Sequence, residues 1–395
     1  MRVLFYSPDY VGHYFAYLAR MMPAFAALPI ERLVATVPEA LDSTVYSATL
    51  ARFADKLSFV TICTQGPQPP VQSARHRLRE LRSAIQQTQP DHVIVGYLDG
   101  LWEQALAPWM TGRRPWPQDM VVEGWIYRTR FGDRSDRRLK SRLRRAMFPL
   151  LLRSGLFRKL HLDGEQLYDF AKPKSAGTPT EVVLSPNPIA MQEPTSTDEA
   201  RRQLGIATDG TWLSLSGMIA RYKGADLLLE AYRHLRELKR EENVRLLLAG
   251  PHEEQVAQAL RAEPFRHWID VGQIVSINRF VDDNEMFLAA AAADLVMAPY
   301  PNHHGRSSII LWAAAAGRPS LGTESGGIGY VIRQQNLGWT CDVANPATLA
   351  KSIATALCAP WNHADAARVR EYAEQHRIEE YQLSASELVR SRLAK

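Results

Sequence analysis

Three kinds of feature are scarce in this chain of 395 residues, and each scarcity excludes a class of protein. The three cysteines, Cys63, Cys341 and Cys358, are too far apart in sequence to predict a disulfide framework or a zinc knuckle. No run approaches the roughly 18–20 apolar residues that span a bilayer. The segment that begins at Met1 is broken too soon for a signal peptide and reads as a first strand. We therefore expect a protein of the reducing cytoplasm.

Several binding signatures are also missing. No Walker P-loop is present, and no G-x-G-x-x-G fingerprint follows a strand, which disfavours a P-loop NTPase and a nicotinamide dehydrogenase. There is no Asp-x-Asp triplet and no His/Cys ligand spacing. The sequence thus predicts that no metal and no cofactor is required.

What is present is the composition of a soluble globular protein, with 46% hydrophobic and 23% charged residues. The length allows two domains with separate cores. The net charge of +5 is uneven, because residues 1–190 hold 25 Lys and Arg against 17 Asp and Glu. The basic character, and any anionic partner, therefore belongs to the N-terminal half.

Short buried strands alternate with helices in both halves of the chain. Val3–Ser7 and Leu33–Val37 are strands of the first half, and Trp212–Leu215 and Leu295–Ala298 are strands of the second. This alternation predicts an α/β protein with two parallel, doubly wound, Rossmann-like sheets. The polar stretch Ala190–Asp198 is the best linker, so we expect domains over residues 1–190 and 191–375.

The stretch from Met297 to Ser320 is the most informative one. It reads as the end of a buried strand, a polar loop and a short apolar helix that stops at Gly317. A helix N-terminus behind a loop with His, Gly, Arg and Ser suits an anion, because free N–H groups and the positive end of the helix dipole converge there. An ordinary loop and core helix is the alternative.

Other loops at the carboxyl ends of strands add to this stretch. In open α/β sheets ligands bind at that edge. In the first half Gly12, His13 and Asp99 lie there, although His13 could also be a capping or packing histidine. The second half supplies cations, glycines and helix N-termini of the kind that hold a diphosphate. These candidates are Arg221, Lys223, Gly224, His304, Gly305, Arg306, Ser307, Ser308, Gly326 and Gly327.

A strongly basic segment runs from Arg128 to Lys159, with twelve Lys and Arg and two Asp. Part of it is predicted to be an amphipathic helix, with Pro149 starting a second turn or helix and with an exposed apolar segment over Phe148–Leu152. Arg138, Arg142 and Arg145 are the candidate contacts. A solvated basic face, an anionic membrane surface and nucleic acid are the three interpretations, and nucleic acid is disfavoured because no recognition motif accompanies the charge.

The second half resembles a known family. Gly217 followed by Lys223–Ala231 looks like a signature of GT-B glycosyltransferases, especially family 4. Segments Ala313–Pro319 and Gly326–Val331 are similar to further motifs of that family, and residues 376–395 are expected to form its helix that crosses back to the first domain. The resemblance implies a GT-B fold with an interdomain cleft, a donor-binding second domain and an acceptor-binding first domain. Phe280 and Val281 would flank the nucleotide base.

The chain departs from the family at important positions. His304 and Trp312 occupy the positions of a Glu-x7-Glu pair that in family 4 contacts the donor sugar and the ribose. Met218 stands where the phosphate-binding Arg is usual. A His at the first position resembles family 1, and the Gly12-His13 loop resembles the loop that carries the general base of inverting enzymes.

The predicted function is metal-independent transfer of a sugar from a nucleotide-sugar donor to an acceptor hydroxyl. The acceptor could be a lipid-linked or cell-surface glycan or a small molecule, and a peripheral position on the inner face of the membrane is a further expectation. His13 would be the base and Asp99 its orienting partner, although a retaining mechanism without a base stays open. A non-catalytic homologue that binds a glycan or a protein is the alternative function.

Overall fold

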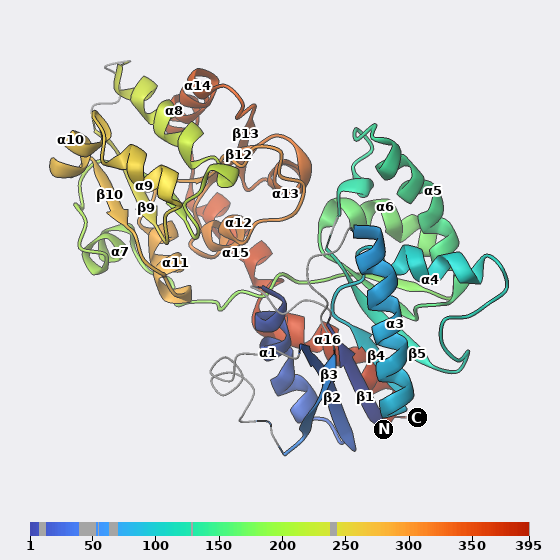
Figure 1. Ribbon diagram of the computed structural model, residues 1–395. Coiled ribbons are helices and arrows are strands. Elements are labelled where there is room, and N and C mark those ends of the chain that lie inside the picture. Colours follow the sequence, from blue (N-terminus) through green and yellow to red (C-terminus); the bar gives the residue numbers. More distant parts are fainter. Residues whose placement is uncertain are drawn as a thin grey trace. The chain divides into compact units, whose positions relative to one another are not determined.

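The computed structural model describes residues 1–7, 13–38, 53, 55–62, 70–127, 129–237 and 243–394. The chain divides into two compact units (Figure 1). Unit 1 comprises Met1–Pro188 and Ile378–Lys395, and unit 2 comprises Ile189–Arg377. The sequence-based boundaries after residues 190 and 375 fall close to these points.

Unit 1 is built on a parallel sheet of seven strands in the order β3-β2-β1-β4-β5-β6-β7. The strands are β1 (Arg2–Tyr6), β2 (Arg32–Pro38), β3 (Leu57–Ile62), β4 (His92–Val95), β5 (Val121–Ile126), β6 (Lys159–Leu162) and β7 (Glu181–Leu184). The helical segments are α1 (His13–Ala26), α3 (Pro70–Thr88), α4 (Leu101–Trp109), η2 (Thr129–Gly132), α5 (Leu139–Ser154), α6 (Glu165–Ser175) and α16 (Ile378–Leu393).

Alternate residues of the central strand β1 serve two separate cores. Val3 and Phe5 belong to a cluster completed by side chains of α1 and α16, whereas Leu4 and Tyr6 belong to a cluster with side chains of α3, α4 and α5. Successive side chains of a strand point to opposite faces. From Val3 to Tyr6 the central strand is therefore apolar, as a sheet covered by helices on both faces requires.

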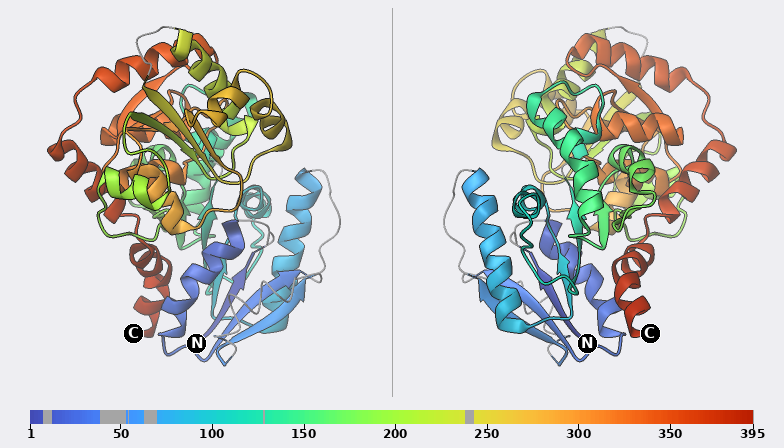
Figure 2. Two further views of the ribbon diagram at one scale, coloured as in Figure 1. Left: turned by 90° about the vertical axis from the view of Figure 1, so that its left-hand side faces the viewer. Right: turned by 90° about the vertical axis from the view of Figure 1, so that its right-hand side faces the viewer.

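The C-terminal helix α16 packs on α1 in unit 1, and the two chain ends lie close together there (Figures 1 and 2). Tyr381 and Val389 bury their side chains in the shared core. Lys159, whose side chain is 3% exposed, places its Nζ 2.5 Å from Oε2 of Glu387 on this helix. Apolar burial and an ion pair thus attach the last helix to the first unit.

A buried polar group lies across three neighbouring strands of this sheet. Glu123 on β5 accepts hydrogen bonds at 2.7 Å from Nε2 of His92 and at 2.9 Å from Nε2 of His161. All three side chains are fully buried. Burial raises the pKa of Glu123, but the hydrogen bonds from His161 and His92 outweigh it and lower the pKa to about 2.

Acid should therefore weaken this unit through Glu123. A carboxyl group with a lowered folded-state pKa contributes stability above its ordinary pKa of 4.5, and this contribution is lost as the pH falls towards 2. The difference in pKa corresponds to about 3 kcal/mol. Urea unfolding between pH 7 and pH 2.5 measures it, and Glu123→Gln should show a shallower pH dependence than the wild type. Equal slopes for the two proteins would contradict the assignment.

Unit 2 is built on a parallel sheet of six strands in the order β10-β9-β8-β11-β12-β13. The strands are β8 (Thr211–Ser216), β9 (Val244–Ala249), β10 (Ile274–Ile277), β11 (Leu295–Ala298), β12 (Ser320–Thr323) and β13 (Gly338–Cys341). The helical segments are α7 (Thr197–Gln203), η3 (Arg221–Lys223), α8 (Ala225–Glu237), α9 (Glu254–Leu260), α10 (Phe265–Asp270), α11 (Asp283–Ala291), α12 (Ser308–Ala315), α13 (Gly326–Gln335), α14 (Pro346–Cys358) and α15 (His363–Glu374).

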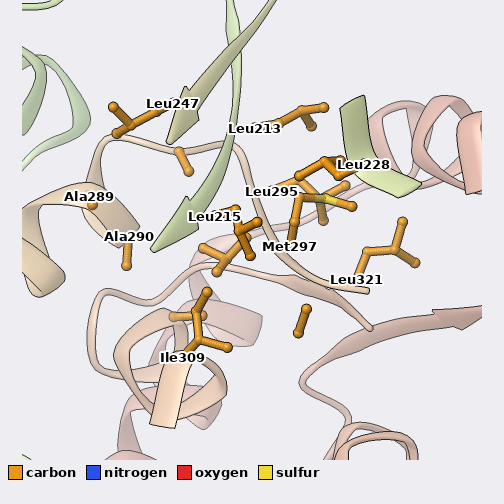
Figure 3. Close-up of a cluster of buried hydrophobic side chains, with 14 of the residues drawn as sticks. Leu213, Leu215, Leu228, Leu247, Ala289, Ala290, Leu295, Met297, Ile309 and Leu321 are labelled. Atoms are coloured by element: carbon orange, nitrogen blue, oxygen red, sulfur yellow. The ribbon is translucent and has the colours of Figure 1, made fainter. Parts of the chain in front are cut away.

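The centre of unit 2 is a close-packed apolar cluster (Figure 3). Leu213 and Leu215 of β8 and Met297 of β11 are buried there together with Ile309 of α12. Small side chains such as Ala290 of α11 let the helices approach the sheet closely. This core fixes the strands whose ends carry the candidate functional loops.

The structure corrects one part of the predicted basic segment. Helix α5 continues through Pro149 instead of restarting there. Phe148, Leu151 and Leu152 are fully buried, so the expected exposed apolar segment is mostly core and only Leu150 is exposed. Burial of these side chains offsets the backbone hydrogen bond that a proline cannot donate. Within the described ranges, no helix is long and apolar enough to cross a membrane.

Candidate functional site

The functional loops of unit 2 meet because three neighbouring parallel strands end at one edge of the sheet. Strand β11 lies between β8 and β12. The chain leaves β8 at Gly217, leaves β11 into the loop that contains His304, and leaves β12 shortly before Gly326. Carboxyl ends of parallel strands share one edge, and this is where open α/β sheets bind ligands.

Three glycines in these loops are required by close backbone contacts. A Cβ on Gly224, which has φ +75, would lie 2.1 Å from the carbonyl oxygen of Pro299. A Cβ on Gly326, with φ +65, would lie 2.2 Å from the carbonyl oxygen of His303, and one on Gly327 would lie 2.6 Å from that of Gly305. Only glycine accommodates both these contacts and the positive φ angles. The predicted glycines thus hold the loops against one another.

Lys223 presents the main positive charge of this edge. Its Nζ lies 3.3 Å from the position that a Cβ on Gly217 would take and 5.5 Å from the ring centroid of Tyr300. Burial lowers the pKa of the Lys223 ammonium group. It forms no ion pair with a carboxylate in the part of the chain that the structure describes. A partly buried cation of this kind is suited to an anionic ligand.

The start of helix α12 is the second feature suited to an anion. Ser307 is its N-cap residue, but its side chain caps no backbone N–H group. Its hydroxyl instead donates to the hydroxyl of Tyr300 at 3.2 Å. Burial raises the pKa of Tyr300, which keeps the phenol protonated. The side chain of Ser307 therefore leaves the first amides of α12, at the exposed Ser308 and at Ile309, free to bind an anion.

The two predicted arginines of unit 2 have other neighbours. Arg221 is exposed, donates from Nη1 to Oε1 of Gln255 at 2.8 Å, and has its Nε 3.5 Å from Oδ2 of Asp226. Arg306 lies near His376, whose pKa is lowered to about 3, first by burial and then by the Arg306 charge. Their predicted contacts with a diphosphate stay predictions, and Lys223 is the better-placed cation.

The residues predicted to contact the nucleotide base and the ribose have different surroundings. Phe280, between β10 and α11, is 78% exposed and offers an open aromatic face. Val281 and Trp312 are buried in the core of unit 2. Trp312 thus contributes to packing at the position where the family resemblance implies a ribose-binding glutamate. Donor contacts of these three residues stay predictions.

In unit 1 the structure places only part of the predicted catalytic pair. Gly12 lies outside the described residues, and so does the side chain of His13, whose backbone begins α1. Asp99 is buried, and its Oδ2 accepts the backbone N–H of Tyr127 at 2.9 Å. Asp99 therefore ties the loop after β4 to the end of β5. Its role beside His13 stays a prediction.

The three predicted arginines of the basic segment also differ from one another. Arg138 and Arg142 are exposed, and Arg138 lies 3.5 Å from the carboxylate of Asp136. Arg145 instead donates to the backbone carbonyls of Phe131, Asp133 and Asp136. Arg145 thus holds the loop that precedes α5. Arg138 and Arg142 remain the candidates for contact with a membrane or an acceptor.

Sequence reasoning missed His252, which braces the loop beside Gly217. Its Nδ1 lies 2.7 Å from the carbonyl oxygen of Gly250, and its Nε2 lies 2.9 Å from Oγ of Ser276. A carbonyl only accepts, so Nδ1 carries the proton and Nε2 accepts from the serine. Burial lowers the pKa of His252 and keeps it neutral. Its place just after the Gly250-Pro251 end of a strand was the only sequence signal.

No group of three His, Cys, Asp or Glu side chains suited to a metal ion occurs among the described residues. The features suited to an anion at this edge are the Lys223 ammonium group, the loop backbone and the N-terminus of α12.

Comparison with known proteins identifies the architecture. The chain has the GT-B fold of glycosyltransferases. It superposes on HepE of Anabaena, solved with UDP and glucose, with a TM-score of 0.61 and 14% identity over 99% of this chain and 100% of that one. WaaG, a glycosyltransferase of lipopolysaccharide biosynthesis, gives a TM-score of 0.61 and 17% identity over 98% and 99% of the two chains.

The sequence comparisons agree with the fold. Residues 210–358 match the family model of glycosyl transferases group 1. The D-inositol 3-phosphate glycosyltransferase of Corynebacterium efficiens is 27% identical over 49% of this chain and 46% of its own length. The lipopolysaccharide 1,2-N-acetylglucosaminetransferase of Salmonella typhimurium is 30% identical over 34% and 36%. The chain thus spans less than half the length of these relatives. The predicted resemblance to GT-B glycosyltransferases is confirmed.

Proposed function

We propose that this protein is a glycosyltransferase that moves a sugar from a nucleotide-sugar donor to an acceptor hydroxyl. The observation that carries the proposal is the position of the Lys223 ammonium group beside Gly217, at the edge where helix α12 begins. This edge lies within the residues that match the group 1 family model. Unit 2 would bind the donor, and unit 1 the acceptor.

In the proposed mechanism Lys223 and the first amides of α12 bind the diphosphate. As the bond between the anomeric carbon and the diphosphate oxygen breaks, negative charge grows on that oxygen. Fixed positive charge and N–H dipoles stabilise this charge most strongly in the transition state. The acceptor oxygen forms the new bond to the anomeric carbon, and its proton passes to the imidazole of His13. No metal takes part in this scheme.

Donor turnover is the test of the proposal. UDP-glucose is the first donor to examine, because the structurally similar HepE was solved with UDP and glucose. We expect release of the nucleoside diphosphate from at least one nucleotide sugar in the presence of EDTA. Neither turnover nor a thermal shift with any nucleotide sugar would favour the alternative, a non-catalytic binding protein. That alternative draws on the burial of Trp312 at a position where the family has a glutamate.

Loss of the proposed general base, His13, should abolish most of the sugar transfer. We expect His13→Ala to lower kcat by about 100-fold or more, because general-base catalysis contributes roughly that much. The acidic limb of the pH profile should disappear at the same time. His363→Ala is a matched control, because His363 also begins a helix and is exposed. Equal activity of His13→Ala and the wild type towards a hydroxyl acceptor would rule out this base.

We also propose that unit 1 docks on an anionic membrane surface at the cytoplasmic face, which would bring it to a lipid-linked acceptor. Helix α5 exposes Leu139 by 79% and Leu143 by 57%, beside the exposed Arg138 and Arg142. Exposed apolar side chains next to cations combine hydrophobic insertion with attraction to anionic lipid headgroups. The lipopolysaccharide enzyme among the relatives is in keeping with such an acceptor.

Membrane docking makes a separate prediction. Replacing Leu139 and Leu143 together by serine should reduce co-sedimentation with anionic vesicles by roughly tenfold, because two exposed leucines lose their burial in lipid. Met110→Ser is the control, since Met110 is 53% exposed elsewhere in the same unit. Binding that is equally weak for neutral and anionic vesicles, or unchanged in the double variant, would refute the docking surface.

A further inference from the structure

A cavity of about 690 Å³ opens in unit 1, at the edge of the sheet opposite to the predicted catalytic residues. It lies at the amino ends of the neighbouring strands β1, β4 and β5, next to the end of helix α3. Small-molecule sites typically have volumes of roughly 300–1,000 Å³. The cavity therefore has the size of a ligand site, and the proposed sugar transfer does not use it.

Positive charge predominates in the lining of this cavity. Arg2, Arg82 and Arg114 contribute three guanidinium groups, and Asp91 contributes the only carboxylate among the lining residues that the structure describes. The Oδ2 atom of Asp91 already accepts the backbone N–H of Arg2 at 2.7 Å. The end of α3 adds about half a negative charge through its dipole. The guanidinium charges exceed both contributions.

Arg82 and Arg114 have guanidinium N–H groups that make no strong hydrogen bond within the described residues. Arg82 is exposed and makes no hydrogen bond or ion pair with residues in the described ranges. Arg114 donates from Nη2 to the carbonyl oxygen of Ser154 at a long 3.4 Å. A guanidinium group has five N–H donors. These two side chains can therefore bind an anion without first breaking a strong contact.

The remaining walls suit the carbon skeleton of an organic ligand. Trp116 is buried, and its indole nitrogen donates to the carbonyl oxygen of Leu156 at 3.1 Å, which fixes the ring. Prolines on either side of it stiffen this wall. Gln89 adds an amide, although its φ of +44 is a left-handed conformation that is unusual for a residue with a side chain. The cavity thus combines cations, an amide and a rigid apolar surface.

We propose that this cavity is a second ligand site that binds a small organic phosphomonoester. Such a group carries a charge of about −1.5 to −2 at neutral pH and three strong acceptor oxygens. A phosphate group on the ligand can therefore bind several guanidinium groups at once, whereas a carboxylate group on the ligand has only one charge and two oxygens. A sugar phosphate also has hydroxyl groups that can bond the Gln89 amide. The site is separate from the predicted catalytic edge, so its ligand would be an effector or an anchor of unit 1.

Binding of glucose 6-phosphate to the whole protein, followed by calorimetry and thermal shift at constant ionic strength, tests the proposal. We expect binding that glucose alone does not reproduce. Arg82→Gln and Arg114→Gln should each weaken it about tenfold, as for loss of a charge-assisted hydrogen bond. Arg79→Gln is the matched control, because Arg79 is exposed on the same helix but does not line the cavity.

Gln89→Gly separates binding from folding. Glycine relieves the left-handed conformation, so this variant should unfold at the same or a higher temperature while binding the phosphomonoester more weakly. Vesicles that contain phosphatidic acid identify the source of the phosphate, because a lipid headgroup would give vesicle binding that depends on Arg82 and a free metabolite would not. No binding of either phosphate, or equal weakening by Arg79→Gln, would overturn the proposal.

Discussion

Lys223→Ala should lower kcat/KM for sugar transfer by about 100-fold or more while the protein remains folded. The ammonium group lies at the edge where β8, β11 and β12 end, and no carboxylate among the described residues neutralises it. Removing one preorganised group that stabilises developing charge typically costs 10²–10³-fold in rate. Initial rates with a saturating acceptor and a range of donor concentrations measure the effect.

Arg221→Ala provides the comparison for Lys223. Arg221 lies two residues away and carries the same charge, but its guanidinium group is exposed and bonded to Gln255. We expect its loss to change kcat/KM by less than about tenfold, because an exposed, solvated charge contributes little. If Arg221→Ala were the more damaging of the two, the diphosphate would have to be placed on Arg221 instead.

Gly224→Ala should be strongly destabilising for unit 2. Its Cβ would lie 2.1 Å from the carbonyl oxygen of Pro299, and its φ of +75 costs a non-glycine residue about 1–2 kcal/mol. Because the obstacle is backbone, the loop after β11 must move, and we expect a total loss of more than about 3 kcal/mol. Urea unfolding gives this difference, and UDP-glucose binding should weaken as well.

Gly272→Ala isolates the contribution of the backbone angle. Gly272 has a φ of +72, but nothing lies within 4 Å of an added Cβ. We expect it to lose only about 1–2 kcal/mol. Similar losses at both positions would show that the loop yields to the added methyl group and that close contact with Pro299 is not essential.

The elements of the fold were largely predictable, because their signals are local. Apolar strand runs such as Val3–Ser7 overlap the observed strands to within a residue at each end, and the stop signals Gly317 and Pro319 lie just after helix α12. Strand β13 (Gly338–Cys341) was not predicted, since it is short, only partly buried and carries no apolar pattern. Pro149 predicted a break that the structure does not have, because tertiary burial of Phe148 and Leu151 keeps α5 helical.

The candidate site was predictable as a set of residues but not as an arrangement. The sequence placed Lys223, Ser307 and Gly326 in loops at strand ends, and the parallel topology brings those loops together. It could not distinguish the engaged Arg145 and Arg221 from Lys223, because their partners are backbone carbonyls and an amide supplied by the folded chain. It also gave little reason to single out His252.

The sequence by itself determined the α/β pattern, the resemblance to GT-B glycosyltransferases and the residues at the carboxyl ends of the strands. Those follow from periodicity, turn chemistry and motif spacing, which are properties of neighbouring residues. Only the tertiary structure decided that Trp312 is core, that Arg145 holds a loop and that a basic cavity lies at the opposite edge of unit 1. Burial and hydrogen-bond partners depend on segments far apart in the chain, so no local pattern encodes them.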